Sequence, residues 1–230
     1  MITIDKTDVF GWESAIRGMR NPMNSWDKSD SVFTMGDNFI GETDLSLMKK
    51  LVKAGSDHSK FMRMINVTCD ITAPLYWWKE YDTYKVGTVA NSCSTMHKIH
   101  AYNFDRSDFS CERLMFPSLQ VLDGVITELN FLRNLYINGG SAYTSNSTVV
   151  DFEARDKRIW DQMIQLLPSS YNQKRTVQLN YAVLRNMYHS RKNHKLDEWR
   201  TFCEWIAKLP YSEIITLKEK EGAADEGSID

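Results

Sequence analysis

The sequence predicts an α+β fold in which a small antiparallel sheet packs against long helices. Apolar and polar residues alternate from Arg63 to Thr72, which is typical of a strand with one buried face. Farther along, apolar residues recur at helical spacing from Leu119 to Tyr136. We therefore expect the sheet to come mainly from the N-terminal half and the long helices mainly from the C-terminal half.

The residues before the alternating segment predict a strand, two helices and a loop. Their patterns place the strand at residues 2–4, one helix around residues 10–19, the loop at 21–41 and the second helix at 44–54. Thr43 is expected to cap the second helix, because its hydroxyl can accept a backbone hydrogen bond. Gly55 is expected to end that helix, since glycine tolerates the left-handed conformation at this position.

Pro74 follows the alternating segment and suits the first turn of a helix, where a backbone N–H has no partner. We expect this helix to run from Leu75 to about Asp82 and to bury Leu75, Trp78 and Tyr81. A polar run at residues 91–94 then precedes another helix through Met96. Short polar side chains in that run can bind a ligand or cap the helix, and both interpretations remain open.

The rest of the chain predicts three further helices. The pattern is irregular at residues 101–116, helical from Pro117 until Gly139-Gly140, polar and loop-like at 141–148, helical at 152–167 until Pro168, and helical again at 199–209. The charged residues 218–230 predict a mobile tail. A chain of 230 residues can bury one sizeable core, so we expect a single domain over residues 1–217.

Composition excludes several classes of protein. There are 28 Lys and Arg residues against 30 Asp and Glu residues, so no general field attracts a nucleic acid, and a phosphate ligand would need a local cluster of cations. No segment has the pattern of a secretion signal or the apolar length of a membrane span, which predicts a cytoplasmic protein. The four cysteines are widely spaced, as expected for reduced thiols.

The order of features after Pro74 resembles the signature region of the flavin-dependent thymidylate synthase family. In that family a strand, Ala-Pro, an aromatic helix, a cationic tripeptide and Asn-x-x-Ser follow one another. Asn91 and Ser94 match the Asn and the Ser. The cationic Arg-His-Arg tripeptide falls on Thr83-Tyr84-Lys85 or on Tyr84-Lys85-Val86, which leaves Lys85 as its cation.

The C-terminal third carries a second part of the resemblance. The spacings from Pro168 to Asn180 and from Asn180 to Arg191 agree with the family, and Asn186 stands at its second Asn. His58, in the turn before the alternating strand, takes the place of a histidine that contacts flavin. A turn histidine with no ligand is an equally open interpretation.

Several charged residues of the family are replaced in this chain. The replacements lie at positions where the family has glutamate or arginine, and they are Arg63, Ser92, Met96, Ile164 and Ala182. A lysine is a point charge and does not reproduce the planar, bidentate contact of an arginine with phosphate. The losses therefore remove much of the family's anion-binding apparatus.

The resemblance implies reductive methylation of a pyrimidine nucleotide, dUMP to dTMP in the family, with FAD, NADPH and methylenetetrahydrofolate. It implies catalytic roles for Ser94 and Arg191, and nucleotide binding by Ser94, Lys85 and Arg191. The residues that it implies for cofactor binding are His58, Asn91, Asn180, Asn186 and Arg191. It also implies a homotetramer with shared active sites, so that Ser94 and Arg191 would meet across an interface.

Two hypotheses follow from these residues. The first is a flavin-dependent enzyme that modifies a pyrimidine nucleotide, with a substrate that differs from the family's. The second is a divergent homologue that keeps the fold and the assembly but acts as a binding or structural protein without flavin chemistry. The matching residues favour the first hypothesis, and the replaced arginines favour the second.

Two other constellations point to different chemistry. Cys93, His97 and His100 are spaced like ligands on one helical face, but no fourth ligand is evident nearby, so we expect no metal. Ser94 with His97 could be a nucleophile and its base, although helix capping explains both residues. The aromatic residues 76–78 could stack on a flavin, and burial in the core explains them equally well.

Overall fold

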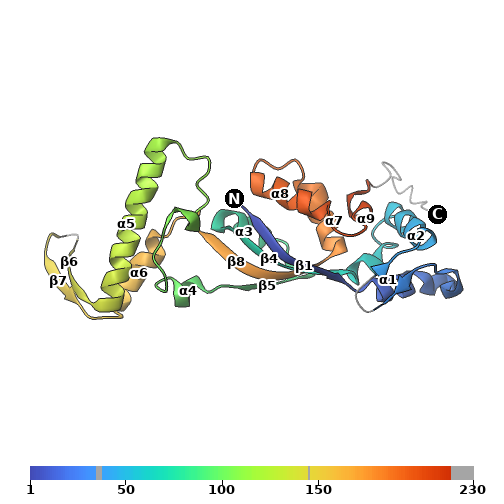
Figure 1. Ribbon diagram of the computed structural model, residues 1–230, viewed down its shortest axis with the longest axis horizontal. Helices are drawn as coiled ribbons and strands as arrows, with labels where there is room; N and C mark the ends of the chain where they lie inside the picture. The colour runs from blue at the N-terminus through green and yellow to red at the C-terminus, as the bar shows by residue number, and fades with distance from the viewer. Residues whose placement is uncertain (35–37, 145, 219–230) are drawn as a thin grey trace, which may run out of the picture. The chain divides into compact units, whose positions relative to one another are not determined.

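Four strands form one sheet in the order β1-β4-β8-β5 (Figure 1). The computed structural model describes residues 1–34, 38–144 and 146–218. The four strands are β1 (Thr3–Phe10), β4 (Asn66–Pro74), β8 (Asn172–Asn180) and β5 (Thr88–Ser92). The sheet is small and antiparallel and is accompanied by several helices, so the expected α+β fold class is confirmed.

The helices and two strand pairs make up the rest of the described chain. The α-helices are α1 (Trp12–Arg20), α2 (Glu42–Lys53), α3 (Leu75–Tyr81), α4 (Thr95–Lys98), α5 (Phe116–Asn138), α6 (Lys157–Leu166), α7 (Tyr181–Arg191), α8 (Asp197–Ile206) and α9 (Glu213–Thr216). The 3-10 helices are η1 (Asn21–Met23), η2 (Trp26–Lys28), η3 (Lys60–Arg63) and η4 (Arg106–Asp108). The strand pairs are β2 (Val32–Phe33) with β3 (Asn38–Phe39), and β6 (Gly140–Tyr143) with β7 (Val149–Phe152). No helix in the described ranges has both the length and the apolar character that crossing a bilayer requires.

The alternation in β4 gives the sheet a buried apolar face, as predicted. Val67, Cys69 and Ile71 are almost fully buried. Burial, with a smaller contribution from neighbouring Asp70, raises the pKa of the Cys69 thiol to about 12. On the other face, Asp70 accepts a hydrogen bond from the Thr176 hydroxyl of β8 at 2.7 Å. The sequence pattern alone therefore set which side chains of β4 enter the core.

The third strand of the sheet, β8, was not predicted. It comes from the C-terminal half of the chain, and few of its residues are apolar. Polar side chains replace the missing apolar contacts: the Arg175 guanidinium lies 4.2 Å from the Trp78 ring centroid and pairs with Asp82 at 2.7 Å. The partners of β8 are thus distant in sequence, and its own residues give no clear strand pattern.

The chain divides into two compact units. One consists of residues 1–3, 71–83 and 91–175, and the other of residues 4–70, 84–90 and 176–230. The division falls within each strand of the four-stranded sheet. The single domain expected over residues 1–217 stays a prediction, and the tail expected to be mobile lies outside the described residues from position 219 onward.

The first unit is built on α5 and α6, which pack against each other. Leu129 and Met163, one from each helix, are fully buried in their shared core. Gly139 ends α5 as predicted: its φ is +71°, and its N–H donates to the Leu135 carbonyl at 2.8 Å. The loop predicted at 141–148 was wrong for residues 141–143, which belong to β6 and pair with β7.

The second unit contains α1, α2 and the three C-terminal helices. Thr43 does not cap α2, because the helix begins at Glu42 and the Asp30 carboxylate accepts hydrogen bonds from the backbone of Thr43 and Asp44. These bonds, above all that from Thr43, lower the pKa of Asp30. Gly55 follows α2 with φ +106°, consistent with its predicted role as the stop.

Candidate functional site

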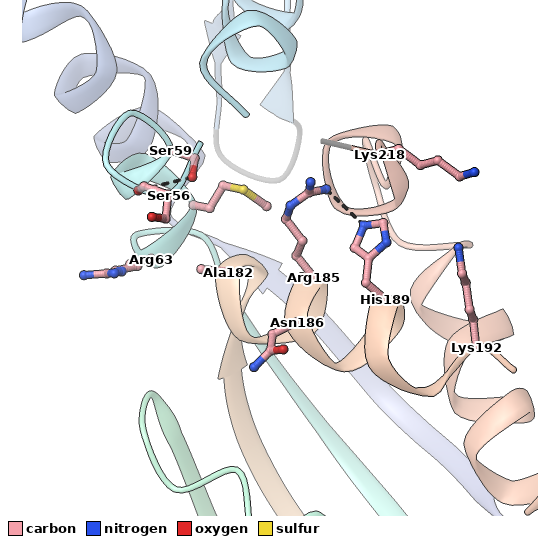
Figure 2. Close-up of a pocket in the computed structure, with 10 residues that line it drawn as sticks. Ser56, Ser59, Arg63, Ala182, Arg185, Asn186, His189, Lys192 and Lys218 are labelled. Atoms are coloured by element: carbon pink, nitrogen blue, oxygen red, sulfur yellow. Dashed lines mark hydrogen bonds between the residues drawn. The ribbon is translucent and has the colours of Figure 1, made fainter. Parts of the chain in front are cut away.

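A pocket of about 690 Å³ lies beside α7 in the second unit (Figure 2). One wall is α7 with the residue after it, a second wall is the segment between α2 and β4, and Lys218 completes the lining. The lining residues are Ser56, Ser59, Met62, Arg63, Ala182, Arg185, Asn186, His189, Lys192 and Lys218. This volume lies within the range of roughly 300–1,000 Å³ that is usual for sites of small molecules and cofactors.

The sequence of α7 turns one polar face toward this pocket. Tyr181, Leu184 and Met187 are fully buried and fix the apolar side of the helix. Asn180 caps the helix, since its side-chain oxygen accepts the Val183 N–H at 3.0 Å. Residues 182, 185, 186 and 189 then follow at the helical spacing that places them on one face, and all four line the pocket.

The opposite wall is a turn followed by η3. The left-handed conformation of Gly55 lets the chain leave α2 and reverse, and the Ser59 hydroxyl donates to the Ser56 carbonyl at 3.4 Å. Met62 is fully buried, whereas Arg63 is exposed at the rim. The backbone N–H of Tyr181 donates to the Ile65 carbonyl at 3.0 Å, which ties the start of α7 to the segment that follows this wall.

The pocket carries an excess of positive charge. Arg63, Arg185, Lys192 and Lys218 line it, and none of the described lining residues is acidic. The pKa of the His189 imidazole is lowered, chiefly because burial disfavours the charged form and also because Arg185 is nearby. The imidazole is thus a neutral hydrogen-bonding group near pH 7, and the four cations make the pocket suited to an anion.

Arg185 and His189 also hold the C-terminal segment of the unit. Nη1 of Arg185 donates to the Ile215 carbonyl at 2.9 Å and also to the Leu217 carbonyl. Nε2 of His189 lies 3.1 Å from the Ile215 carbonyl oxygen and 3.2 Å from Nη1 of Arg185, the interaction drawn in Figure 2. The two side chains therefore connect α7 to the chain just before Lys218.

Of the seven site residues predicted from the sequence, all of which are described, Asn186 is the one that lines this pocket. Its side-chain oxygen accepts a hydrogen bond from the Ser190 hydroxyl at 3.3 Å, and the residue is exposed. His58 is exposed in the turn between Ser56 and Ser59, both of which line the pocket. The structure thus brings Asn186 and the His58 turn to one site.

Asn180 is placed at the start of α7, where its amide has a structural use. The side-chain oxygen of Asn180 caps the helix. A Cβ atom added at Gly87, whose φ is +73°, would lie 2.8 Å from the Nδ2 atom of Asn180. Gly87 thus allows the chain after α3 to pass close to the capping side chain. Lys85, two residues earlier, is exposed.

Arg191 lies at the end of α7 and is not among the pocket-lining residues described here. Its Nε donates to the Tyr84 hydroxyl at 2.9 Å. Its guanidinium carbon lies 4.8 Å from the Trp199 ring centroid and 5.6 Å from that of Tyr84. The guanidinium is therefore embedded between aromatic rings, in a geometry that stabilises the cation.

Asn91 and Ser94 belong to the first unit. Asn91 is exposed in β5. Ser94 caps α4, because its hydroxyl accepts the backbone N–H of His97 at 3.2 Å. The capping interpretation of Ser94 is thus confirmed. The donor to its hydroxyl is the backbone N–H of His97 and not the imidazole ring.

The alternative metal constellation depends on a helix longer than the one observed. Helix α4 ends at Lys98, so its periodicity does not extend from Cys93 to His100. Within residues 1–34, 38–144 and 146–218, no group of three or more His, Cys, Asp or Glu side chains could hold a metal ion.

The residues that sequence reasoning missed are the cations of the pocket, Arg63, Arg185, Lys192 and Lys218, together with His189. A signal was present, since Arg185, His189 and Lys192 recur at i, i+4 and i+7 beside an apolar stripe. The pattern could have identified a polar helix face. It could not have shown that the turn after α2 lies opposite that face.

The fold is similar to that of solved nucleotide-modifying enzymes. A crystal structure of the flavin-dependent thymidylate synthase ThyX from Helicobacter pylori, complexed with FAD and dUMP, matches with a TM-score of 0.63 and 15% sequence identity, over 92% of this chain and 95% of that chain. A second structure of ThyX from Helicobacter pylori with FAD and dUMP has the same TM-score and identity, over 93% of this chain and 96% of that chain. The UMP/dUMP methylase PolB from Streptomyces cacaoi, bound with 5-Br dUMP, matches with a TM-score of 0.56 and 12% identity, over 94% of each chain.

No protein-family model matches the chain, and no curated protein matches it in sequence. At identities of 12–15% the likeness establishes the fold alone. The similarity of fold implied by the sequence resemblance is therefore confirmed.

Proposed function

We propose that this protein is a flavin-dependent enzyme that modifies a pyrimidine nucleotide, with FAD held in the pocket beside α7. The observation that carries the proposal is the cation-lined pocket, in which Asn186 and the turn of His58 meet. The similar solved structures support it, because the ThyX structure is a complex with FAD and dUMP and the PolB structure is bound with 5-Br dUMP. The reaction proposed is reductive methylation of the pyrimidine, with NADPH and methylenetetrahydrofolate as co-substrates.

The donor set of the pocket suits a dinucleotide cofactor. The diphosphate of FAD is anionic, and Lys192 would bind it by a charge-assisted contact. The hydroxyls of Ser56 and Ser59 and the Asn186 amide can hydrogen-bond its polar groups. When bound, FAD supplies the hydride chemistry, and the protein's part is to bind and orient it.

Following the resemblance, the nucleotide site is proposed to be shared between subunits of an assembly, with Ser94 from one subunit and Lys85 and Arg191 from another. Lys85 is exposed and offers a point charge for a phosphate, whereas Arg191 offers a planar guanidinium at the end of α7. Ser94 and Arg191 are proposed as the catalytic residues. Asn186 is proposed as the cofactor-binding residue within the pocket. The resemblance adds His58, Asn91, Asn180 and Arg191, which are proposed to bind the cofactor through the shared active sites of the assembly.

A homotetramer is proposed on the basis of α5. This helix is apolar on more than one side, and its Phe116, Val121 and Phe131 side chains are 72%, 69% and 46% exposed. Exposed apolar residues on one long helix are typical of an interface between subunits. Self-association would remove these side chains from water.

The second candidate function is a binding protein that retains the fold without flavin chemistry. Two observations favour it. The Arg191 guanidinium already binds the Tyr84 hydroxyl and packs on Trp199, and the Ser94 hydroxyl already caps α4. Both proposed catalytic side chains therefore have structural uses that require no substrate.

Titration of the full-length protein with FAD, followed by gel filtration and visible absorbance, tests the first candidate. Retained flavin absorbance is the expected result, and Asn186→Ala should weaken FAD binding because it removes a lining amide. Asn193→Ala is the matched control, since Asn193 is exposed just beyond α7 and does not line the pocket. No flavin binding at high FAD concentration would reject the first candidate in favour of the second.

A further inference from the structure

We infer that Lys218, which the C-terminal segment 213–218 brings to the α7 pocket, is a specificity-determining cation that contacts a diphosphate group of the ligand. This inference rests on the site of the proposed function and deepens it. It adds a cation from the C-terminal segment, outside both parts of the chain on which the resemblance was based. Arg185 is the positioning residue that holds this segment.

The segment is anchored by its own apolar residues. Ile214 and Ile215 of α9 are fully buried. The carbonyl of Pro210, which precedes α9 in the chain, accepts a hydrogen bond from the Tyr181 hydroxyl at 2.6 Å. Helix α9 itself packs against both α7 and α2. The backbone that leads to Lys218 is therefore fixed on the core of the second unit.

Arg185 satisfies the carbonyl groups at the end of this segment. The last carbonyls of a helix have no partners within the helix, and here those of Ile215 and Leu217 accept hydrogen bonds from Nη1 of Arg185. Arg185 is only 9% exposed, so burying its charge depends on such acceptors. The bond to Leu217 fixes the residue immediately before Lys218.

The geometry places an exposed lysine at the pocket. Lys218 lines it from the C-terminal segment and Lys192 from the end of α7, and Figure 2 shows both on the same side of Arg185. Two ammonium groups are point charges that suit the separate phosphates of a diphosphate. A ligand with a single carboxylate or without charge would gain little from this pair, so the pair selects for a diphosphate.

The test is calorimetric titration of the full-length protein with inorganic pyrophosphate and, separately, with FAD. Lys218→Gln should lower the affinity for each about three- to fivefold at low salt, the range expected for one exposed charge contact. The loss should shrink as salt is added, because salt screens exposed charges. Lys208→Gln is the matched control, since Lys208 is exposed in the same unit and does not line the pocket.

The positioning role of Arg185 is tested by combining a variant of Arg185 with Lys218→Gln. If Arg185 acts by positioning the segment, Lys218→Gln should have a smaller effect on pyrophosphate affinity in an Arg185→Gln background than in the wild type. Equal effects in the two backgrounds would overturn the positioning role. Because Lys218 is exposed, its single variants remain informative even if the Arg185 variant does not fold.

The outcomes separate this inference from the proposed function. Pyrophosphate binding that depends on Lys218, in a protein that binds no FAD, would support the inference and reject the flavin proposal. FAD binding that is unchanged in Lys218→Gln would overturn the inference and leave the flavin proposal standing. Failure of the wild type to bind either ligand would overturn both.

Discussion

The Nε atom of Arg191 donates a hydrogen bond to the Tyr84 hydroxyl oxygen at 2.9 Å, while the same guanidinium packs over the Trp199 ring. Arg191 and Tyr84 are 107 positions apart in the chain. The bond joins the end of α7 to the segment that matches the cationic tripeptide of the flavin-dependent thymidylate synthases. Tyr84 belongs to both possible alignments of that tripeptide, and it stands at the histidine in one and at the first arginine in the other.

The first prediction concerns nucleotide binding by Arg191. If this guanidinium binds the phosphate of the nucleotide, Arg191→Ala should lower the affinity for dUMP about 10- to 100-fold, as expected when a charged hydrogen bond is lost. Calorimetric titration with dUMP measures the change. Sedimentation of the same variant shows whether its assembly is intact.

Tyr84→Phe is the matched variant, because it removes the hydroxyl that accepts the Arg191 Nε–H and keeps the aromatic ring. It should leave the dUMP affinity within about twofold while weakening the packing of α7 slightly. If both variants lower the melting temperature and neither changes dUMP binding, Arg191 is a structural residue and the proposed nucleotide site is wrong.

The second prediction concerns the buried ion pair of the second unit. Nε of Arg20 lies 2.6 Å from Oδ1 of Asp44, and Oδ2 of Asp44 accepts hydrogen bonds from the hydroxyls of Ser29 and Ser31. Asp44→Ala would leave the Arg20 charge buried without its carboxylate, which should cost about 3–5 kcal/mol of unfolding free energy. Urea denaturation measures the change.

The control for this pair is the double variant Arg20→Met with Asp44→Leu. It removes both charges and should be less destabilised than Asp44→Ala, because no uncompensated charge remains. Equal destabilisation of the two proteins would show that the loss comes from packing and not from the unpaired charge.

The third prediction is a pH dependence from His189. Burial, and next the charge of Arg185, lower its pKa from the ordinary value of 6.5 in the folded protein. As the pH falls below 6.5, the unfolded chain takes up a proton that the folded protein does not, so stability falls until the lowered pKa is passed. His189→Gln keeps a hydrogen-bonding group and should lose less stability than the wild type between about pH 7 and pH 5.

Unfolding free energies measured across this pH range test the prediction. His100 also has a lowered pKa, from burial and from Arg155, Lys98 and Arg133, so the variant should retain part of the pH dependence. His97→Gln is a suitable control, since His97 is exposed. A pH dependence in His189→Gln equal to that of the wild type would show that His189 titrates alike in both states.

The fourth prediction concerns self-association through α5. Phe131→Lys places a charge on the exposed apolar side of this helix and should shift the protein toward smaller species in sedimentation velocity. Met23→Lys is the control, because Met23 is 82% exposed and lies outside α5, in the second unit. A monomeric wild type, or a tetramer unaffected by Phe131→Lys, would contradict the proposed interface.

Structural elements whose sequences have a strong local periodicity were predicted well. The alternation of β4, the apolar stripe of α5 and the glycines that end α2 and α5 were all identifiable, because each depends on neighbouring residues and on simple periodicity. Strand β8 was missed, because its Arg175 is accommodated by Trp78 and Asp82 from elsewhere in the chain. Strand β6 was missed because its small and polar residues resemble a loop, which left β7 without a predicted partner.

The α+β class, the main helices and the resemblance in order and spacing to a known family could thus be predicted from the amino-acid sequence. Which polar residues meet became evident from the folded chain. Arg63, Arg185 and Lys218 come from three separate segments, and their common pocket depends on how α7 packs against the turn after α2 and against α9. A local pattern reports which face of an element is buried, whereas an anion site requires particular distances between elements, and packing sets those distances.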